Sequence, residues 1–177
     1  GRYTAILAEG LADIRKLSTG GGTIVALRSD GTVWSWGAGS RGQLGNGDRR
    51  RRLAPEPIDG VGPADKLFGG ESDVVVIGAG GVLTAWGNNE QAADRLALSQ
   101  DELMAGGPWD NALGLHGVTS VAVGWSSVVA LKSDGTVWVT GGWRTNENGA
   151  ATPETRPERV RQLANITAIA SGRLTKY

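Results

Sequence analysis

The sequence predicts an all-β protein: a β-propeller, or part of one, built from four-stranded blades. Three observations support this prediction: a repeat of about 50 residues, short runs of β-branched residues between glycines, and strands that are apolar on both sides. About three complete repeats are present, with a partial blade at each end. Units of this length that each fold as one small sheet are typical of propellers.

The repeat is clearest at a hairpin motif. Residues 30–37 read DGTVWSWG, and the motif returns as GGVLTAWG at 80–87 and as DGTVWVTG at 134–141. A segment that ends in glycine precedes each copy, and a fourth such segment lies near the end of the chain. The four closing glycines are Gly20, Gly70, Gly124 and Gly172. Their spacings of 50, 54 and 48 residues show that one unit is repeated.

Each unit contains four short strands, which we expect in the following order. The first is IRKLS at 14–18, after which glycine can adopt a positive φ. The second is TIVALR at 23–28 and the third is TVWSW at 32–36, joined by Ser-Asp-Gly, which suits a tight hairpin. The fourth is the proline-led PEPI at 55–58, which suits a strand start or a sheet edge.

The second strand of the last complete unit indicates how the sheets are packed. In SVVALK at 127–132, both alternating rows of side chains are apolar, so the strand is covered on both faces. Helix is a poor alternative, because β-branched residues dominate and glycines recur every ten residues or so. Four-stranded sheets that are covered on both faces are best explained as blades around an axis.

The chain is long enough for one domain with a core of its own. We divide residues 1–177 into a partial blade, three repeats and a second partial blade. The boundaries are 1–10, 11–62, 63–117 with an insertion at 90–116, 118–165, and 166–177. The two ends could close a small ring within one chain or pair between two chains, and truncation of a longer propeller is equally compatible with the sequence.

Composition limits the classes of function. Lys and Arg together number 18, as do Asp and Glu, so no overall charge favours nucleic acid. The absence of cysteine removes disulfides, thiolate metal sites and a thiol nucleophile. The longest uncharged stretch, 74–89, is too short and too rich in glycine to span a bilayer. We expect a protein partner rather than nucleic acid or membrane, and the sequence does not distinguish a secreted from a cytoplasmic protein.

No residues form a convincing catalytic or cofactor site. GAGSRGQLG at 37–45 lacks the Gly-Lys-Ser/Thr of a phosphate loop, so its glycines are interpreted as turn formers. His116 is the single histidine and has no second His or Cys with which to share a metal. Asp30 and Asp134 occupy the same hairpin turn in two copies, which favours a turn role. We therefore expect no enzyme activity, no cofactor and no metal.

The repeat resembles a known family. ALRSDGTVWSWGAGSRGQLGNGD, from residue 26 to residue 48, and ALKSDGTVWVTGG, from residue 130 to residue 142, are similar to the repeat of the regulator of chromosome condensation family. Only the first copy contains the Gly-Gln-Leu-Gly loop, at residues 42–45. The later copies keep the strands and turns but lack this loop. The resemblance implies a propeller, usually seven-bladed. It also implies several partner classes, because relatives include an exchange factor for the GTPase Ran and secreted bacterial propellers that inhibit β-lactamases.

The composition of the chain narrows the partner classes that the resemblance implies. A sequence rich in alanine, glycine and arginine indicates a high-GC bacterium, which argues against an exchange factor for Ran. Binding to a protein partner, as an inhibitor or regulator, is then the function that we expect. Two alternatives remain: a structural half-propeller that forms a homodimer or pairs with another propeller fragment, and a scaffold domain of an enzyme. Unpaired strands at both ends favour some form of closure.

Connections alternate between the two sides of an up-and-down blade, and this predicts a partner-binding face. Seven residues fall in connections on one side: Trp109, Trp125, Trp143, Arg49, Arg50, Arg51 and Arg52. Trp and Arg often anchor interfaces. The alternatives are tryptophans that fill gaps between blades and a solvated arginine loop. The insertion at 90–116 is either decoration or an element that reaches a partner. The strand tryptophans Trp34, Trp36, Trp86 and Trp138 are interpreted as packing residues.

Overall fold

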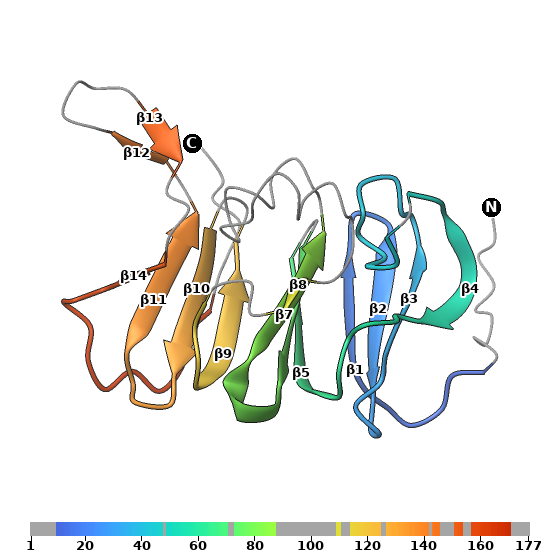
Figure 1. Cartoon of the computed structure of the whole chain (residues 1–177), viewed down its shortest axis with the longest axis horizontal. Helices are drawn as coiled ribbons and strands as arrows, with labels where there is room; N and C mark the ends of the chain where they lie inside the picture. The colour runs from blue at the N-terminus through green and yellow to red at the C-terminus, as the bar shows by residue number, and fades with distance from the viewer. Residues whose placement is uncertain are drawn as a thin grey trace, which may run out of the picture.

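Three antiparallel sheets make up most of the described part of the molecule. The computed structural model describes residues 10–47, 49–70, 73–87, 109–110, 114–124, 127–141, 143–145, 151–153 and 157–170. They form three four-stranded sheets and one two-stranded ribbon. The three sheets stand side by side like blades (Figure 1). The predicted all-β fold of four-stranded blades is confirmed.

The first blade has the expected order of strands. Its strands are β1 (Ile14–Gly20), β2 (Thr23–Arg28), β3 (Val33–Gly37) and β4 (Arg52–Pro57). Gly31, in the turn between β2 and β3, has a φ of +85°, which glycine tolerates because it has no Cβ. β4 begins three residues before the expected Pro55. It is the outermost strand, where a proline without an N–H group is tolerated.

The second blade is covered on both faces. Its strands are β5 (Ala64–Gly69), β6 (Asp73–Gly78), β7 (Leu83–Gly87) and β8 (Trp109–Asp110), and the 3₁₀ turn η1 (Ala79–Gly81) joins β6 to β7. Four consecutive residues of β6, Val74 to Ile77, are all at most 6% exposed. A strand with this pattern has apolar neighbours on both sides, in agreement with the position of this blade between the other two (Figure 1).

The third blade carries an additional ribbon. Its sheet contains β9 (Val118–Val123), β10 (Ser127–Lys132), β11 (Val137–Gly141) and β14 (Glu158–Arg159). Between β11 and β14 the chain forms a hairpin of β12 (Trp143–Thr145) and β13 (Ala151–Pro153). This ribbon projects beyond the end of the blade, at the upper left of Figure 1.

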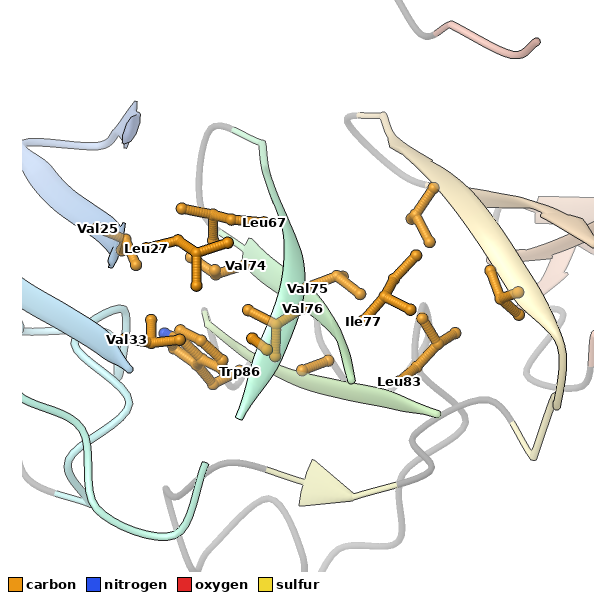
Figure 2. Close-up of a cluster of buried hydrophobic side chains, with 14 of the residues drawn as sticks. Val25, Leu27, Val33, Leu67, Val74, Val75, Val76, Ile77, Leu83 and Trp86 are labelled. Carbon is orange, nitrogen blue, oxygen red and sulfur yellow. The ribbon is translucent and has the colours of Figure 1, made fainter. Parts of the chain in front are cut away.

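The core lies between the blades. Figure 2 shows Val25, Leu27 and Val33 of the first blade facing Leu67, Val74 and Trp86 of the second. From the opposite face of the second blade, Ile77 and Leu83 point toward the third (Figure 2). The apolar side chains on each face of a blade are therefore buried only when a neighbouring blade covers that face.

A β-bulge at equivalent positions links each blade to the next. The register shifts leave one extra residue near the start of each first strand: Arg15, Asp65 and Thr119. A bulged residue leaves the regular ladder, so its carbonyl can accept a bond from elsewhere. Arg15 Nη2 donates to the Asp65 carbonyl at 2.8 Å, and Lys66 Nζ donates to the Thr119 carbonyl at 2.6 Å. A cation of one blade thus bonds the bulge of its neighbour.

Two sequence predictions about the chain ends have different outcomes. Residues 166–170, expected as the first strand of a further blade, are not a strand. The Ile166 N–H donates to the Gly135 carbonyl at 3.2 Å, as the Ala64 N–H does to the Gly31 carbonyl at 2.9 Å. The segment therefore begins where a next blade would begin, but no described strand lies beside it to complete a ladder. The strand expected within residues 1–10 lies outside the described residues, apart from Gly10.

Candidate partner-binding face

The strand order places alternate connections on opposite sides of the blades. Connections from first to second and from third to fourth strands share one side, which we call the loop side. The hairpins from second to third strands share the other, the hairpin side. At the top of Figure 1, the loop side carries the β3–β4 connection and the β12–β13 ribbon. Both elements therefore extend from a rigid sheet toward the same side.

The Gly-Gln-Leu-Gly loop of the first blade, residues 42–45, is held by buried contacts. Leu44 is fully buried, and its carbonyl accepts a 2.8 Å hydrogen bond from the Ser35 hydroxyl. Trp86 of the second blade donates its indole N–H to the Gln43 carbonyl at 3.1 Å. Gly45 has a φ of +67°, and a Cβ atom there would lie 2.9 Å from the Trp86 ring. Blade packing thus accounts for the glycine at position 45.

The four arginines that follow this loop have different environments. Arg49, Arg50 and Arg51 are exposed, whereas Arg52 is half-buried and begins β4. Arg52 Nε lies 3.1 Å from a carboxylate oxygen of Glu56, and its Nη1 donates to the buried Ser35 hydroxyl at 3.4 Å. Arg52 therefore anchors the end of the connection. The exposed guanidinium groups before it extend from an anchored segment.

The three tryptophans expected on this face are described to different extents. The backbone of Trp143, which the sequence placed in a loop, lies in β12 and pairs with Pro153 in the ribbon between β11 and β14. The sequence predicted a loop at Trp109, and this prediction is wrong, because the backbone of Trp109 forms part of a strand. Trp109 belongs to β8 and pairs with Ala85, so the insertion itself supplies the fourth strand of the second blade. Trp125 lies outside the described residues. The same is true of most of the insertion at 90–116.

A cavity of about 420 Å³ lies where the first strands converge. Its walls come from β1, β5, β9 and residues 166–170, and they include Leu17, Phe68, Val121 and Ile169. Lys16 is the charged residue among those that line it. Sequence reasoning did not anticipate this cavity, because it is formed by strands about 50 residues apart.

A second cavity of about 350 Å³ shares Lys16, Leu67 and Phe68 with the first. Arg15 and Lys66 add positive charge to its lining, against one carboxylate from Asp65. Two of these cations already donate to backbone carbonyls of the next blade. The inner wall of the blades is therefore a partly apolar surface with a small excess of positive charge.

Asp30 and Asp134 occupy the turns that the sequence predicted. Each carboxylate accepts hydrogen bonds from the Thr two residues later, at 2.6 Å from the hydroxyl and 2.9 Å from the N–H. Those bonds, the hydroxyl bond foremost, hold the pKa of both carboxyls below the ordinary value of 3.8. The Thr32 and Thr136 hydroxyls in turn accept the indole N–H of the next tryptophan. Both aspartates thus act as turn residues.

The described residues offer little for metal or redox chemistry. No group of three or more His, Asp or Glu side chains within them could hold a metal ion. His116 is exposed at the end of the insertion. No helix in the described part of the chain is long and apolar enough to cross a membrane.

The chain matches models of one repeat family along much of its length. A model of the regulator of chromosome condensation (RCC1) repeat matches residues 30–85, and a second model of that repeat matches 14–43 and 118–150. Together these matches cover more than half of the chain. The chain belongs to the RCC1 repeat family. Propeller repeats of the RCC1 type are typical of protein interaction and regulator domains.

Similar proteins of known sequence are much longer than this chain. E3 ubiquitin-protein ligase HERC2 of Homo sapiens is 33% identical over 127 residues, covering 69% of this chain and 3% of the ligase. Ultraviolet-B receptor UVR8 of Arabidopsis thaliana is 28% identical over 139 residues, covering 77% of this chain and 30% of the receptor. The similarity concerns the RCC1 repeats, so it does not extend the ligase or receptor activity to this chain.

Solved structures show the same fold. Human WBSCR16 superposes with a TM-score of 0.67 at 24% identity, covering 84% of this chain and 38% of that one. Yeast RCC1 (Prp20), solved with Kap60 bound, gives a TM-score of 0.69 at 21% identity, covering 87% of this chain and 36% of that one. The blades of this protein are therefore blades of an RCC1-type β-propeller.

Proposed function

We propose that this protein is a recognition module that binds a protein partner through its loop side and so inhibits or regulates that partner. Membership of the RCC1 repeat family supports an interaction role. Charge balance supports a protein rather than a nucleic-acid partner. Trp125 and Trp143 are proposed as further contacts, because their positions in the strand order fall on this side. Trp109 is kept as a contact near the start of β8.

The observation that carries the proposal is the anchoring of the arginine run. Leu44 and the Trp86 contact hold the connection on one side of this run, and the bonds of Arg52 to Glu56 and Ser35 hold it on the other. Exposed Arg49 and Arg51 thus lie between two anchored parts of the connection. A pre-organised loop loses less conformational entropy when it binds, and arginine is a frequent anchor of interfaces.

The test compares exposed arginines of the loop side with an exposed arginine that follows β14. The double variant Arg49→Ala/Arg51→Ala removes two exposed cations from the loop side. Arg161→Ala removes an exposed cation beyond β14 and serves as the matched control. Partners captured from the source organism by the unchanged protein are identified by mass spectrometry, and their Kd is then measured with purified proteins. We expect the double variant to weaken binding at least about tenfold, or about 1.4 kcal/mol, and the control to leave it unchanged. Equal binding by all three proteins would contradict the proposal.

One alternative function has a specific observation in its favour. Leu17, in the first blade, is an apolar side chain with 53% of its surface exposed, which favours assembly of this blade with another element. A scaffold role in an enzyme, the other alternative, has no corresponding observation in its favour among the described residues.

A further inference from the structure

Two consecutive positions of the repeat supply most of the wall of the cavity of about 420 Å³. The first position contributes a row of aliphatic side chains: Leu17, Leu67, Val121 and Ile169. The next position contributes a second row: Ser18, Phe68, Ala122 and Ala170. Three members of the second row are small, so they leave space between the strands. The volume of this space lies within the range of sites that bind small molecules.

Phe68 is the one large side chain in the second row. It is the single phenylalanine of the chain, and it lines both this cavity and the adjoining cavity of about 350 Å³. Its neighbour in β5, Leu67, points toward the first blade (Figure 2), so Phe68 lies on the face of β5 that points toward the third. Phe68 is half-buried and packs against the core. The accessible part of its ring therefore borders the cavities.

Lys16 is a cation that the links between blades do not use. Lysine is the third residue of both β1 and β5, at Lys16 and Lys66. Lys66 Nζ donates to the Thr119 carbonyl of the next blade at 2.6 Å. The corresponding acceptor for Lys16 is the Asp65 carbonyl, but Arg15 Nη2 donates to that oxygen at 2.8 Å. The Lys16 ammonium makes no hydrogen bond or ion pair within the described residues, and it lines both cavities.

An accessible ring and an unbonded ammonium group thus border the same space, and together they define the chemistry of a ligand. Lys16 is the charged residue in the lining of the larger cavity, so no carboxylate of that lining neutralises it. An ammonium group binds a carboxylate through charge-assisted hydrogen bonds. A phenyl ring gains most from a second ring that packs against it edge-to-face or offset. The complementary ligand is an aromatic ring that carries one carboxylate.

We propose that the cavity at the inner wall binds a small, free aromatic carboxylate, with the acid group on the Lys16 ammonium and the ring against Phe68. One unbonded lysine matches the single charge of a carboxylate, whereas a phosphate ester carries about two charges at neutral pH. A cavity of about 420 Å³ has room for one ring with a short acid chain. The arginine run at 49–52 does not line this cavity, so the site is independent of the proposed loop-side function.

The first experiment titrates the full ¹⁵N-labelled chain with 3-phenylpropanoate and follows backbone amide shifts by NMR. We expect saturable changes at residues 16–19, 67–69, 120–123 and 169–170, with a Kd of about 1 mM or tighter. Two matched probes separate the contributions: 3-phenylpropanamide lacks the charge, and hexanoate lacks the ring. Each should bind at least about threefold more weakly. Absence of saturable shifts at these residues, or equal binding of the amide, would overturn the proposal.

The second experiment repeats the titration with variants of the two residues. Lys16→Met keeps the apolar stem and removes the ammonium, and Phe68→Leu keeps an apolar side chain without a ring. We expect each to raise the Kd for 3-phenylpropanoate at least about threefold. Lys132→Met is the matched control, because Lys132 lines neither cavity, and it should leave the Kd unchanged. If Phe68→Leu does not fold, as judged by its amide spectrum, Lys16→Met decides alone. An unchanged Kd in folded Lys16→Met would show that the assignment is wrong.

A third titration distinguishes a free small molecule from the end of a protein chain, which offers the same chemistry. The probe is the tripeptide Gly-Gly-Phe with a free terminal carboxylate. We expect it to bind no more tightly than 3-phenylpropanoate, since the cavity has room for the ring and the acid group but not for a longer chain. Binding at least about tenfold tighter, lost in Lys16→Met, would identify a chain terminus as the occupant and overturn the assignment to a free small molecule.

Discussion

Gly45 of the first blade and Trp86 of the second are in direct contact, with room for hydrogen but not for a methyl group between them. A Cβ atom on Gly45 would lie 2.9 Å from Cδ1 and from Nε1 of the indole. The same indole donates to the Gln43 carbonyl at 3.1 Å. One turn thus provides a polar bond and a close apolar contact to the neighbouring blade. This contact therefore joins two consecutive repeat units.

The Gly45–Trp86 contact predicts a large effect of the smallest possible side chain. Gly45→Ala adds a strained positive φ and a steric clash with a buried ring, and we expect it to lower the free energy of unfolding by about 2–4 kcal/mol. Gly80→Ala is the control: its φ of +69° matches the +67° of Gly45, and a Cβ there meets nothing within 4 Å. It should cost about 1–2 kcal/mol. Urea unfolding followed by tryptophan fluorescence measures both, and equal losses would exclude a role for the clash.

The link through the bulges can be tested with a pair of corresponding lysines. Lys66→Met removes the 2.6 Å bond to the Thr119 carbonyl while keeping an apolar stem of similar length, and we expect a loss of about 1 kcal/mol. Lys16 occupies the corresponding place in the first blade, and its ammonium makes no hydrogen bond within the described residues. Lys16→Met should change stability by less than about 0.5 kcal/mol. Thermal unfolding of both variants gives the comparison, and an equal effect would show that the bond to Thr119 contributes nothing.

Much of the fold could be predicted because its signals are local. Short runs of β-branched residues, Ser-Asp-Gly turns and closing glycines each specify a strand or a hairpin within a few residues, and the four-stranded blades follow from their repetition. The misplaced elements lacked such signals. β4 starts in the arginine run at Arg52, where charged residues do not indicate a strand. β8 has two residues and lies within a segment rich in helix formers, so pairing with β7 decides its structure.

The candidate site was less predictable, because it depends on contacts between units. Nothing within residues 49–52 distinguishes Arg52 from its neighbours, and only the positions of Glu56 and Ser35 give it a structural role. The contact of Gly45 with Trp86 joins residues about 40 positions apart. One signal could have revealed it: the tryptophan at this place in the repeat is absent where the preceding unit lacks Gly-Gln-Leu-Gly.

The carboxylates of Asp30 and Asp134, in the hairpin turns, lead us to predict how the stability of the fold responds to acid. Because the pKa of Asp30 is lowered in the folded protein, its ionised form stabilises the fold fully above pH 3.8, and this contribution is lost as the pH falls through the folded pKa. Thr32→Val removes the hydroxyl that contributes most, so the pKa of Asp30 should rise toward 3.8. Asp134 keeps Thr136 and should titrate as before, which makes it an internal control. A carboxyl-detected NMR titration follows both groups, and an unchanged Asp30 would show that the hydroxyl is not the cause.

Arg52 and Arg51 are adjacent in the chain, and the structure predicts opposite consequences for their removal. Arg52→Ala removes the ion pair with Glu56 and the bond to Ser35, so we expect the free energy of unfolding to fall by about 1 kcal/mol. Arg51 is exposed, and Arg51→Ala should change stability by less than about 0.5 kcal/mol. If the loop side binds a partner, Arg51→Ala should instead raise the Kd of the complex at 25 °C, where both variants remain folded. Urea unfolding and a binding isotherm on the same two proteins separate the effects. Equal losses of stability would mean that the loop is not anchored at Arg52, and the case for a pre-organised arginine run would fail with it.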